Sequence, residues 1–152
     1  MQYVSSAGEG GECIFCTGRD AADEKAAHVV HRGQLTIVIL NAFPYNTGHL
    51  MIAPQRHVGE LEECSTEERS EIIETTTTCI GIVRDEMGAH GFNVGMNLGR
   101  VAGAGIPGHL HVHVVPRWGG DTNFMPLVAD TKVLPEMLSE TYAKLRPRFA
   151  EL

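Results

Sequence analysis

The sequence lacks the features of a membrane or exported protein. No apolar run approaches the roughly 20 residues that are needed to span a bilayer. The first residues, MQYVSSAGEGGE, contain neither the basic region nor the apolar core of an export signal. We therefore predict a cytoplasmic protein that makes no contact with a membrane.

The chain is also short of positive charge. Its 12 Lys and Arg residues are outnumbered by 19 Asp and Glu residues, which gives a formal net charge of -7. Broad, sequence-independent binding of nucleic acid requires a basic surface, so this composition argues against it. A small phosphate-bearing ligand is compatible with the charge, because a few local donors are enough to hold it.

Cysteine is scarce as well, since the 152 residues include only four. Without an export signal, these are better interpreted as thiols or metal ligands than as a disulfide framework. The length, with 43% hydrophobic and 20% charged residues, is typical of one soluble globular domain. We predict a flexible arm at residues 1–12, rich in Gly, Ser and Glu, and a single domain at residues 13–152.

A run of alternating histidines is the most informative feature that the sequence does contain. In GHLHVHVVP, residues 108–116, three histidines alternate with aliphatic residues. Successive side chains on a strand point to opposite faces, so the run predicts a strand with His109, His111 and His113 on one face. A solvent-facing edge strand is the alternative. Three histidines in such a run are unusual for an exposed strand, and an imidazole can act as ligand, nucleophile or acid. The run therefore indicates a functional site.

This run resembles the histidine-triad motif of the HIT superfamily of nucleotide hydrolases and transferases. Three further stretches are similar to its dinucleoside polyphosphate branch: NAFPYNTGHLMIAPQRH at 41–57, GFNVGMNLG at 91–99 and PRWGGDTNFMP at 116–126. The resemblance covers nearly the whole chain after residue 12. It implies an α+β fold, with a five-stranded antiparallel meander, one long helix and a C-terminal helix, and it implies a homodimer.

The apolar patterns place these elements along the chain. We expect strands at 29–31, 35–41, 49–54, 91–99 and 109–115, and a C-terminal helix at 135–146. The long helix should run over 66–87, with Ser65 as its N-cap. Its apolar spacing makes Cys79 a core residue, whereas Cys64 is expected to be a surface thiol.

Cys13 and Cys16 form a Cys-x-x-Cys pair, which can hold one tetrahedral ion if two further ligands come from elsewhere. The resemblance supplies them, because the other ligands of zinc-containing members match His57 and His109. We expect a structural Cys2His2 zinc and no organic cofactor. A redox pair and two ordinary thiols are the alternatives, although a thioredoxin-type motif needs a preceding strand and a Gly-rich arm precedes Cys13.

The resemblance also assigns the catalytic roles. His111 matches the nucleophile that forms a nucleotidyl-histidine, while His113 and His49 match histidines beside the attacked phosphate. For His49, a polar residue that only borders a turn is the alternative. A neutral imidazole can attack phosphorus if its remote nitrogen is fixed by a hydrogen-bond acceptor.

Four residues are expected to contact the nucleotide. Asn41 matches a ribose-binding position, with a strand-end cap as the alternative. Asn97 matches a position that contacts phosphate or nucleotide, and the backbone around Gly105 can approach an anion. Trp118 could stack on a base or close a dimer contact, or it could simply pack in a surface loop.

One departure from the family pattern concerns the leaving group. Many members have Gln followed by Ser or Thr before the triad, but this chain has Gly105 and Ile106. Activation of the leaving group then has to come from a backbone donor, another side chain or a second substrate.

The resemblance favours an enzyme that cleaves dinucleoside polyphosphates, such as diadenosine tri- or tetraphosphate, by hydrolysis or phosphorolysis. A purine nucleoside phosphoramidase or AMP-conjugate hydrolase is the first alternative, and a non-catalytic nucleotide-binding scaffold protein is another. A hydrolase that uses the three histidines as metal ligands lacks an accompanying carboxylate pattern.

Overall fold

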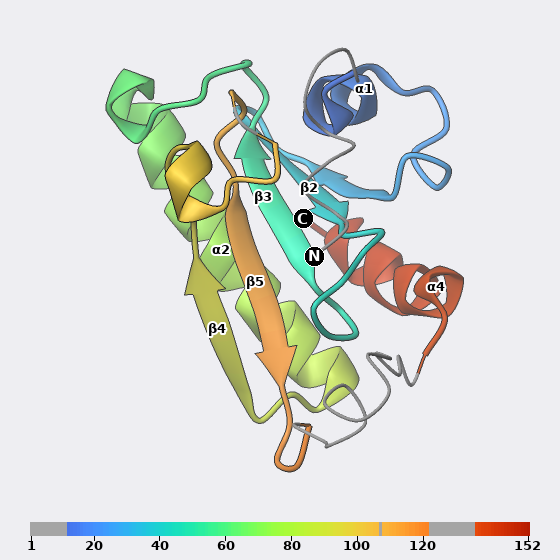
Figure 1. Cartoon of the computed structure of the whole chain (residues 1–152). Helices are drawn as coiled ribbons and strands as arrows, with labels where there is room; N and C mark the ends of the chain where they lie inside the picture. Colours follow the sequence, from blue (N-terminus) through green and yellow to red (C-terminus); the bar gives the residue numbers. More distant parts are fainter. Residues whose placement is uncertain (1–11, 107, 122–135) are drawn as a thin grey trace.

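Five strands form one antiparallel sheet in the computed structural model, which describes residues 12–106, 108–121 and 136–152. The strands are β1 (Val29–Arg32), β2 (Thr36–Leu40), β3 (Leu50–Pro54), β4 (Gly91–Gly95) and β5 (Val112–Arg117) (Figure 1). The helices are α1 (Ile14–Asp20), α2 (Thr66–Met87) and α4 (Leu138–Phe149), with short 3-10 helices η1 (Leu61–Glu63) and η2 (Arg100–Ala102). Apart from Glu12, the predicted flexible arm lies outside the described residues.

The strand order is β1-β2-β3-β5-β4, so the antiparallel sheet is confirmed but the expected simple meander is wrong. β5 inserts between β3 and β4, which places His113 opposite Met51 on one side and Gly95 on the other. This central position gives β5 hydrogen-bonded partners along both edges and places the buried side chains of Val112 and Val114 on the face that α2 covers. The histidine strand is therefore interior to the sheet.

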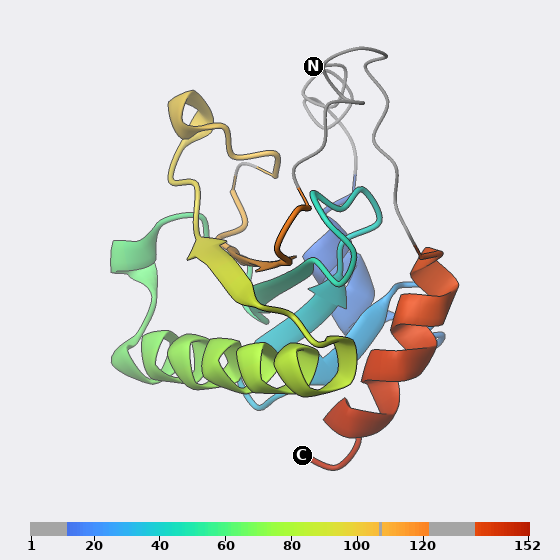
Figure 2. The ribbon, with the colours of Figure 1, turned by 90° about the horizontal axis from the view of Figure 1, so that it is seen from below.

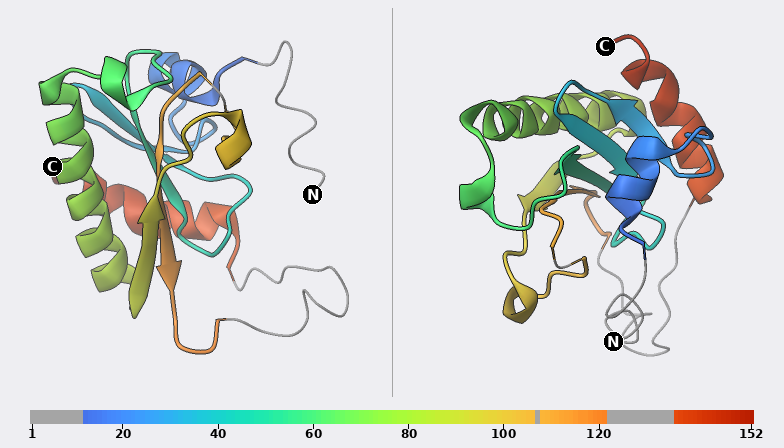
Figure 3. Two further views of the ribbon diagram at one scale, coloured as in Figure 1. Left: turned by 60° about the vertical axis from the view of Figure 1, so that its left-hand side comes forward. Right: turned by 90° about the horizontal axis from the view of Figure 1, so that it is seen from above.

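Helices cover the two faces of the sheet unequally (Figures 2 and 3). α2 and α4 pack on one face, over the larger hydrophobic core. α1 packs on the other face, where Phe15 is fully buried among side chains of β1, β2 and β3. The 41–49 turn and η2 lie on this second face as well (Figure 3). Side chains that point to this less covered face can meet a ligand.

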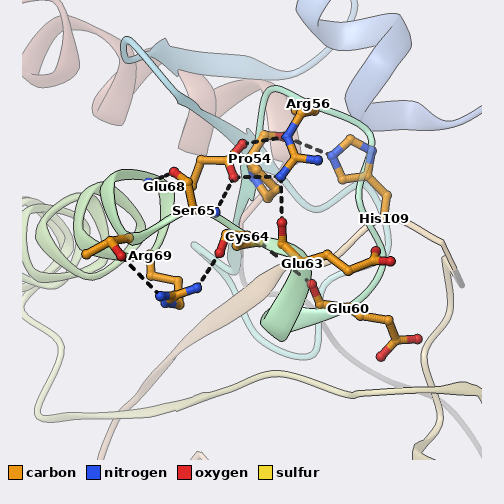
Figure 4. A network of polar contacts seen from close by, with 10 residues as sticks. Pro54, Arg56, Glu60, Glu63, Cys64, Ser65, Glu68, Arg69 and His109 are labelled. Atoms are coloured by element: carbon orange, nitrogen blue, oxygen red, sulfur yellow. Dashed lines mark hydrogen bonds and ion pairs between the residues drawn. The ribbon is translucent and has the colours of Figure 1, made fainter.

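The start of α2 was predicted at the residue where it is found. The hydroxyl of Ser65 accepts from the Glu68 backbone N–H at 3.1 Å, and Glu68 accepts from the Ser65 N–H at 2.8 Å, which completes a capping box. Arg56, which follows β3, donates to both carboxylate oxygens of Glu68 at 3.0 and 2.8 Å (Figure 4). The end of β3 is thereby tied to the N-terminus of α2.

Four local expectations differ from the structure. The strand expected over 109–115 runs over Val112–Arg117, because the Leu110 N–H donates to the Val58 carbonyl beyond the end of β3, so His109 and His111 directly precede the strand. The strand expected over 91–99 ends at Gly95, because the chain then leaves the sheet toward η2. Cys64 is 3% exposed rather than a surface thiol, since it packs with Val58 and Leu110 in a small separate cluster. The C-terminal helix runs over Leu138–Phe149, three residues beyond the expected end, because Leu145 and Phe149 are buried in the core, and the expected first residue, Pro135, lies outside the described residues. Cys79 is fully buried, as predicted.

Candidate active site and metal centre

A cavity of about 490 Å³ opens on the less covered face of the sheet. His111 and His113 lie in its wall, together with Asn41, Asn97 and Gly105, which the sequence placed at the nucleotide. The remaining lining residues are Ile14, Ala42, Phe43, Pro44, Tyr45, Met51, Gly103 and Ile106. A mainly apolar cavity with a few convergent polar groups is the usual form of a small-molecule site.

The orientation of His111 is set by the segment that leads into β5. Its Nδ1 donates to the backbone carbonyl of His109 at 2.9 Å, because a carbonyl oxygen can only accept. Burial lowers the pKa of His111, so the ring is neutral near pH 7. A neutral imidazole that donates from Nδ1 carries its lone pair on Nε2, which makes that nitrogen the nucleophilic atom.

His49 and His113 form an ordered pair beside it. The backbone N–H of Tyr45 donates to His49 Nδ1 at 3.1 Å, so the proton of His49 is on Nε2. That nitrogen lies 2.9 Å from His113 Nδ1 and donates to it, which leaves the proton of neutral His113 on its own Nε2. The chain of donors therefore ends in an N–H on His113, beside the ring of His111.

Asn41 directly follows β2 and borders this pair. Its Oδ1 accepts from the Phe43 N–H at 2.9 Å, and its amide nitrogen lies 3.2 Å from His49 Nδ1. The strand-end cap that was left open for Asn41 is thus present. The carbonyl oxygen has a second lone pair, and the residue lines the cavity, so the cap leaves one acceptor for a ligand hydroxyl.

The protonation of His113 gives a prediction about stability. Burial, and then the neighbouring His111, lower the pKa of His113 to about 4 from 6.5. Between these values the unfolded chain binds more protons than the folded one, so the free energy of unfolding falls as the pH falls from 6.5 to about 4. Because the ring is partly exposed, we expect a loss of about 1–2 kcal/mol, well below the unscreened value.

The measurement is chemical denaturation of the wild type and His113→Gln at several pH values in this range. Glutamine does not titrate, so the difference in free energy of unfolding between the two proteins should shrink as the pH falls. A difference that stays constant from pH 7 to pH 4 would show that His113 has an ordinary pKa.

A second cluster lies at the start of α1. Cys13 immediately precedes the helix and Cys16 is in its first turn, so the predicted Cys-x-x-Cys turn opens a helix. Cys13 Sγ lies 3.1 Å from His109 Nδ1, and Cys16 Sγ lies 3.2 Å from His57 Nδ1. All four ligand atoms lie within 4.8 Å of one another. The structure therefore brings together the four residues that the sequence predicted as metal ligands.

The donor set fits a tetrahedral zinc ion. With Zn–S of about 2.3 Å and Zn–N of about 2.0–2.1 Å, a sulfur and a nitrogen on one ion lie about 3.5 Å apart. The Nε2 of His109 donates to the Pro54 carbonyl at 2.8 Å, which leaves the Nδ1 lone pair directed at the cysteines. Burial raises the pKa of Cys13, but its contact with the His109 imidazole and with the backbone at Cys16 outweighs this and lowers it to about 6.

The structure does not bring Trp118 to the cavity. Its indole N–H donates to the Met87 carbonyl at 3.2 Å, and its ring packs against the larger core. The carboxylate of Asp121 accepts from the Trp118 N–H and pairs with Arg117, which folds the loop back over the end of α2. These contacts agree with the packed surface loop that was one alternative, and contact of Trp118 with a nucleotide or with a second subunit stays a prediction.

Sequence reasoning did not identify the apolar wall of the cavity. Ile14, Phe43 and Tyr45 line it although 42%, 66% and 65% of their surfaces are exposed. Two aromatic residues in a short turn beside a histidine were a usable signal, because exposed aromatic rings are uncommon on surfaces without a ligand.

Residues 22–120 match the model of the HIT domain family. The chain belongs to the HIT family. It is 47% identical over 122 residues to an AP-4-A phosphorylase of Mycobacterium tuberculosis, a match that covers 80% of this chain and 63% of the relative. This HIT chain therefore spans less than two thirds of that relative's length.

Two more distant relatives extend the comparison. A bis(5'-nucleosyl)-tetraphosphatase (asymmetrical) of Schizosaccharomyces pombe is 28% identical over 102 residues, covering 67% of the HIT chain and 56% of the relative. A zinc-bound histidine triad family protein from Mycobacterium smegmatis has a crystal structure with the same fold, with a TM-score of 0.72, 24% identity, and coverage of 92% and 94%. The α+β fold predicted from the sequence is thus confirmed.

Proposed function

We propose that the protein cleaves dinucleoside polyphosphates, such as diadenosine tri- or tetraphosphate, at the α-phosphate through a nucleotidyl-His111 intermediate. The hydrogen bond of His111 Nδ1 to the His109 carbonyl carries this proposal, because it leaves Nε2 free in the wall of the cavity. The names of the M. tuberculosis and S. pombe relatives support the substrate class.

The reaction has two balanced steps. Nε2 of His111 attacks the α-phosphorus, and the bond to the bridging oxygen breaks, so the leaving nucleotide takes that oxygen with its electron pair. The imidazole becomes cationic, and the His109 carbonyl stabilises it through Nδ1–H. Water or inorganic phosphate then attacks the same phosphorus and releases His111 with its lone pair restored.

Neighbouring donors hold the phosphate. The Nε2–H of His113 can donate to a non-bridging oxygen, and His49 keeps that proton in place through its own bond to His113 Nδ1. The amide of Asn97 and the backbone near Gly105 lie in the same cavity wall. Asn41 offers its remaining lone pair to the ribose hydroxyls. With Ile106 in place of a hydroxyl residue, the chain supplies no side-chain hydroxyl at that position for the leaving oxygen.

Product analysis tests this proposal. With diadenosine tetraphosphate, hydrolysis gives AMP and ATP, and phosphorolysis gives ADP and ATP only when phosphate is present. Cleavage of adenosine 5'-phosphoramidate with no cleavage of the dinucleotide would favour the AMP-conjugate alternative. Tight binding of the dinucleotide with no product at all would favour a nucleotide-binding scaffold.

We further propose that Cys13, Cys16, His57 and His109 hold a structural zinc. The ion would supply no chemistry to the phosphate, since the ligand atom of His109 points away from the His111 ring toward the cysteines. Its effect would be to fix the start of the triad strand against α1, and so the carbonyl that orients His111.

Three broader expectations stay proposals. A homodimer is compatible with the outer edge of β4, which is the last strand in the sheet order. Val94, in β4, is 47% exposed, and Val101, in η2, is fully exposed. Measuring the mass of the protein in solution tests dimerisation. Among the described residues, no helix has the length and apolar character that crossing a bilayer requires. None of the four cysteines, all of which lie among the described residues, forms a disulfide, which is compatible with the cytoplasmic location predicted above. That residues 13–152 form a single domain is likewise our proposal.

A further inference from the structure

The 41–49 turn, which joins β2 to β3, carries the donors that orient His49. The backbone N–H of Tyr45 lies 3.1 Å from His49 Nδ1, and the amide nitrogen of Asn41 lies 3.2 Å from the same atom. Asn41 is itself held by the turn, because its Oδ1 accepts from the Phe43 N–H at 2.9 Å. Both donors require an unprotonated Nδ1, so the proton of this fully buried ring is on Nε2. The position of the turn therefore sets the tautomer of His49.

Asn46 ties the tip of this turn to β5. Its amide group donates to the Pro116 carbonyl at 3.0 Å and to Asp121 Oδ2 at 3.1 Å. A carbonyl and an ionised carboxylate can only accept, so this orientation of the amide is fixed. The backbone carbonyl of Asn46 also accepts from the His49 N–H at 3.2 Å. Asn46 thus joins the turn that orients His49 to the strand that carries His113.

The anchor on the β5 side has its own support. The Pro116 carbonyl belongs to β5 itself. Arg117 donates to both carboxylate oxygens of Asp121, at 2.5 and 2.9 Å, and the Trp118 N–H donates to Oδ2 at 3.2 Å. A carboxylate that is held by a bidentate guanidinium has a defined position. Asn46 therefore fastens the turn to a fixed point.

The tautomer of His49 controls the proton that faces the phosphate. His49 Nε2 lies 2.9 Å from His113 Nδ1 and donates to it, so the proton of His113 is on its own Nε2, beside the His111 ring. If the proton of His49 moved to Nδ1, its Nε2 would become an acceptor. His113 would then have to donate from Nδ1, and its Nε2 would have no proton for a phosphate oxygen.

We propose that Asn46 is a positioning residue for catalysis. By fixing the turn it keeps His49 in the Nε2–H tautomer, and it thereby keeps a proton on His113 Nε2. This inference rests on the proposed function, since only that function puts a phosphate beside His113. The tautomers themselves exist without substrate, so they can be tested separately.

NMR of the protein without ligand tests the tautomers. Labelling of the histidine ring nitrogens distinguishes a protonated nitrogen from an unprotonated one, and single His→Gln variants assign the signals. Near neutral pH, wild-type His49 and His113 should be protonated on Nε2 only. Asn46→Ala removes the amide that anchors the turn, so we expect averaged signals from two tautomers of His49.

Kinetics with diadenosine tetraphosphate test the effect on the reaction. A donor that acts on the transition state affects kcat more than KM, so Asn46→Ala should lower kcat about tenfold and change KM by less than about threefold. Asn46→Asp keeps the shape but cannot donate and places a second charge beside Asp121, so its kcat should fall at least as far. In a His49→Gln background, Asn46→Ala should change kcat by less than about twofold, because the residue through which it acts is already gone.

Asn93→Ala is the matched control. Asn93 is exposed and accepts from Arg117 at 2.8 Å, at the same end of β5. Its substitution removes a polar contact from this end of the strand and leaves the amide of Asn46 in place. We expect kcat within about threefold of the wild type and a single tautomer of His49.

The other outcomes overturn defined statements. A single Nε2–H tautomer of His49 in Asn46→Ala, with kcat unchanged, overturns the proposal, and so does an equally large loss of kcat in the His49→Gln background. Thermal melts identify a misfolded variant, and in that case wild-type His49 protonated on Nδ1 overturns the proposal. A wild type that cleaves no dinucleotide overturns the proposed function, while the spectra still show whether Asn46 fixes the tautomers.

Discussion

Replacing His111 with alanine is expected to lower kcat for diadenosine tetraphosphate by at least about 1,000-fold, because the variant has no atom that can form the nucleotidyl intermediate. The neighbouring donors remain in His111→Ala, so substrate binding should be retained. The loss should therefore appear in kcat, with KM changed much less. Steady-state kinetics with resolved nucleotide products checks this expectation.

His90 provides a matched control for this substitution. It is an exposed histidine that accepts from the Gly119 N–H and does not line the cavity. We expect His90→Ala to keep kcat within about threefold, as is usual for an exposed residue outside a site. If His111→Ala retains a tenth or more of the wild-type rate while its melting temperature is unchanged, His111 is not the nucleophile.

Removing one zinc ligand is expected to have the second large effect. Cys16→Ser should lose one equivalent of zinc and lower the melting temperature by about 10 °C or more, since a structural site contributes its binding free energy to folding. Here the ion would join the start of α1 to His57, which follows β3, and to His109, which precedes β5. Loss of the ion therefore removes an attachment of a helix that packs on β1 and β2. Metal analysis and thermal melts with and without a chelator measure both quantities.

Cys64→Ala is the matched control, because Cys64 is buried but belongs to a different cluster. Its zinc content should equal that of the wild type, even if packing is weakened. Purified wild type that contains no zinc, and that melts at the same temperature with and without a chelator, would contradict a structural metal.

Much of this architecture follows from local patterns. The Ser65 cap and the apolar spacing of α2 gave that helix its observed bounds, because capping and one-sided burial are local and period-dependent effects. The alternation around His111 likewise placed His111 and His113 on one side, where both line the cavity, although only His113 lies within β5. The order of β4 and β5 in the sheet was not predictable in this way, since the same strand patterns would allow either of them to pair with β3.

The candidate site shows the same limit. The histidines and the Cys-x-x-Cys pair are chemically distinctive, so residue type and spacing identified them. Tyr45 and Ile14 were missed, because what makes them cavity residues is the approach of the 41–49 turn and α1 on one face of the sheet. The contacts of Trp118 were not predictable for a similar reason, since its hydrogen bond to Met87 joins two segments that are far apart in the sequence.

The most direct test of the proposed mechanism is a single-turnover incubation of excess protein with diadenosine tetraphosphate, without phosphate, stopped with alkali at short times. Peptide mass spectrometry then locates any adduct. The account predicts a transient AMP adduct on the peptide that contains His111, formed together with ATP and lost as AMP appears. Appearance of AMP and ATP at the same rate with no adduct, or an adduct on another residue, would contradict it.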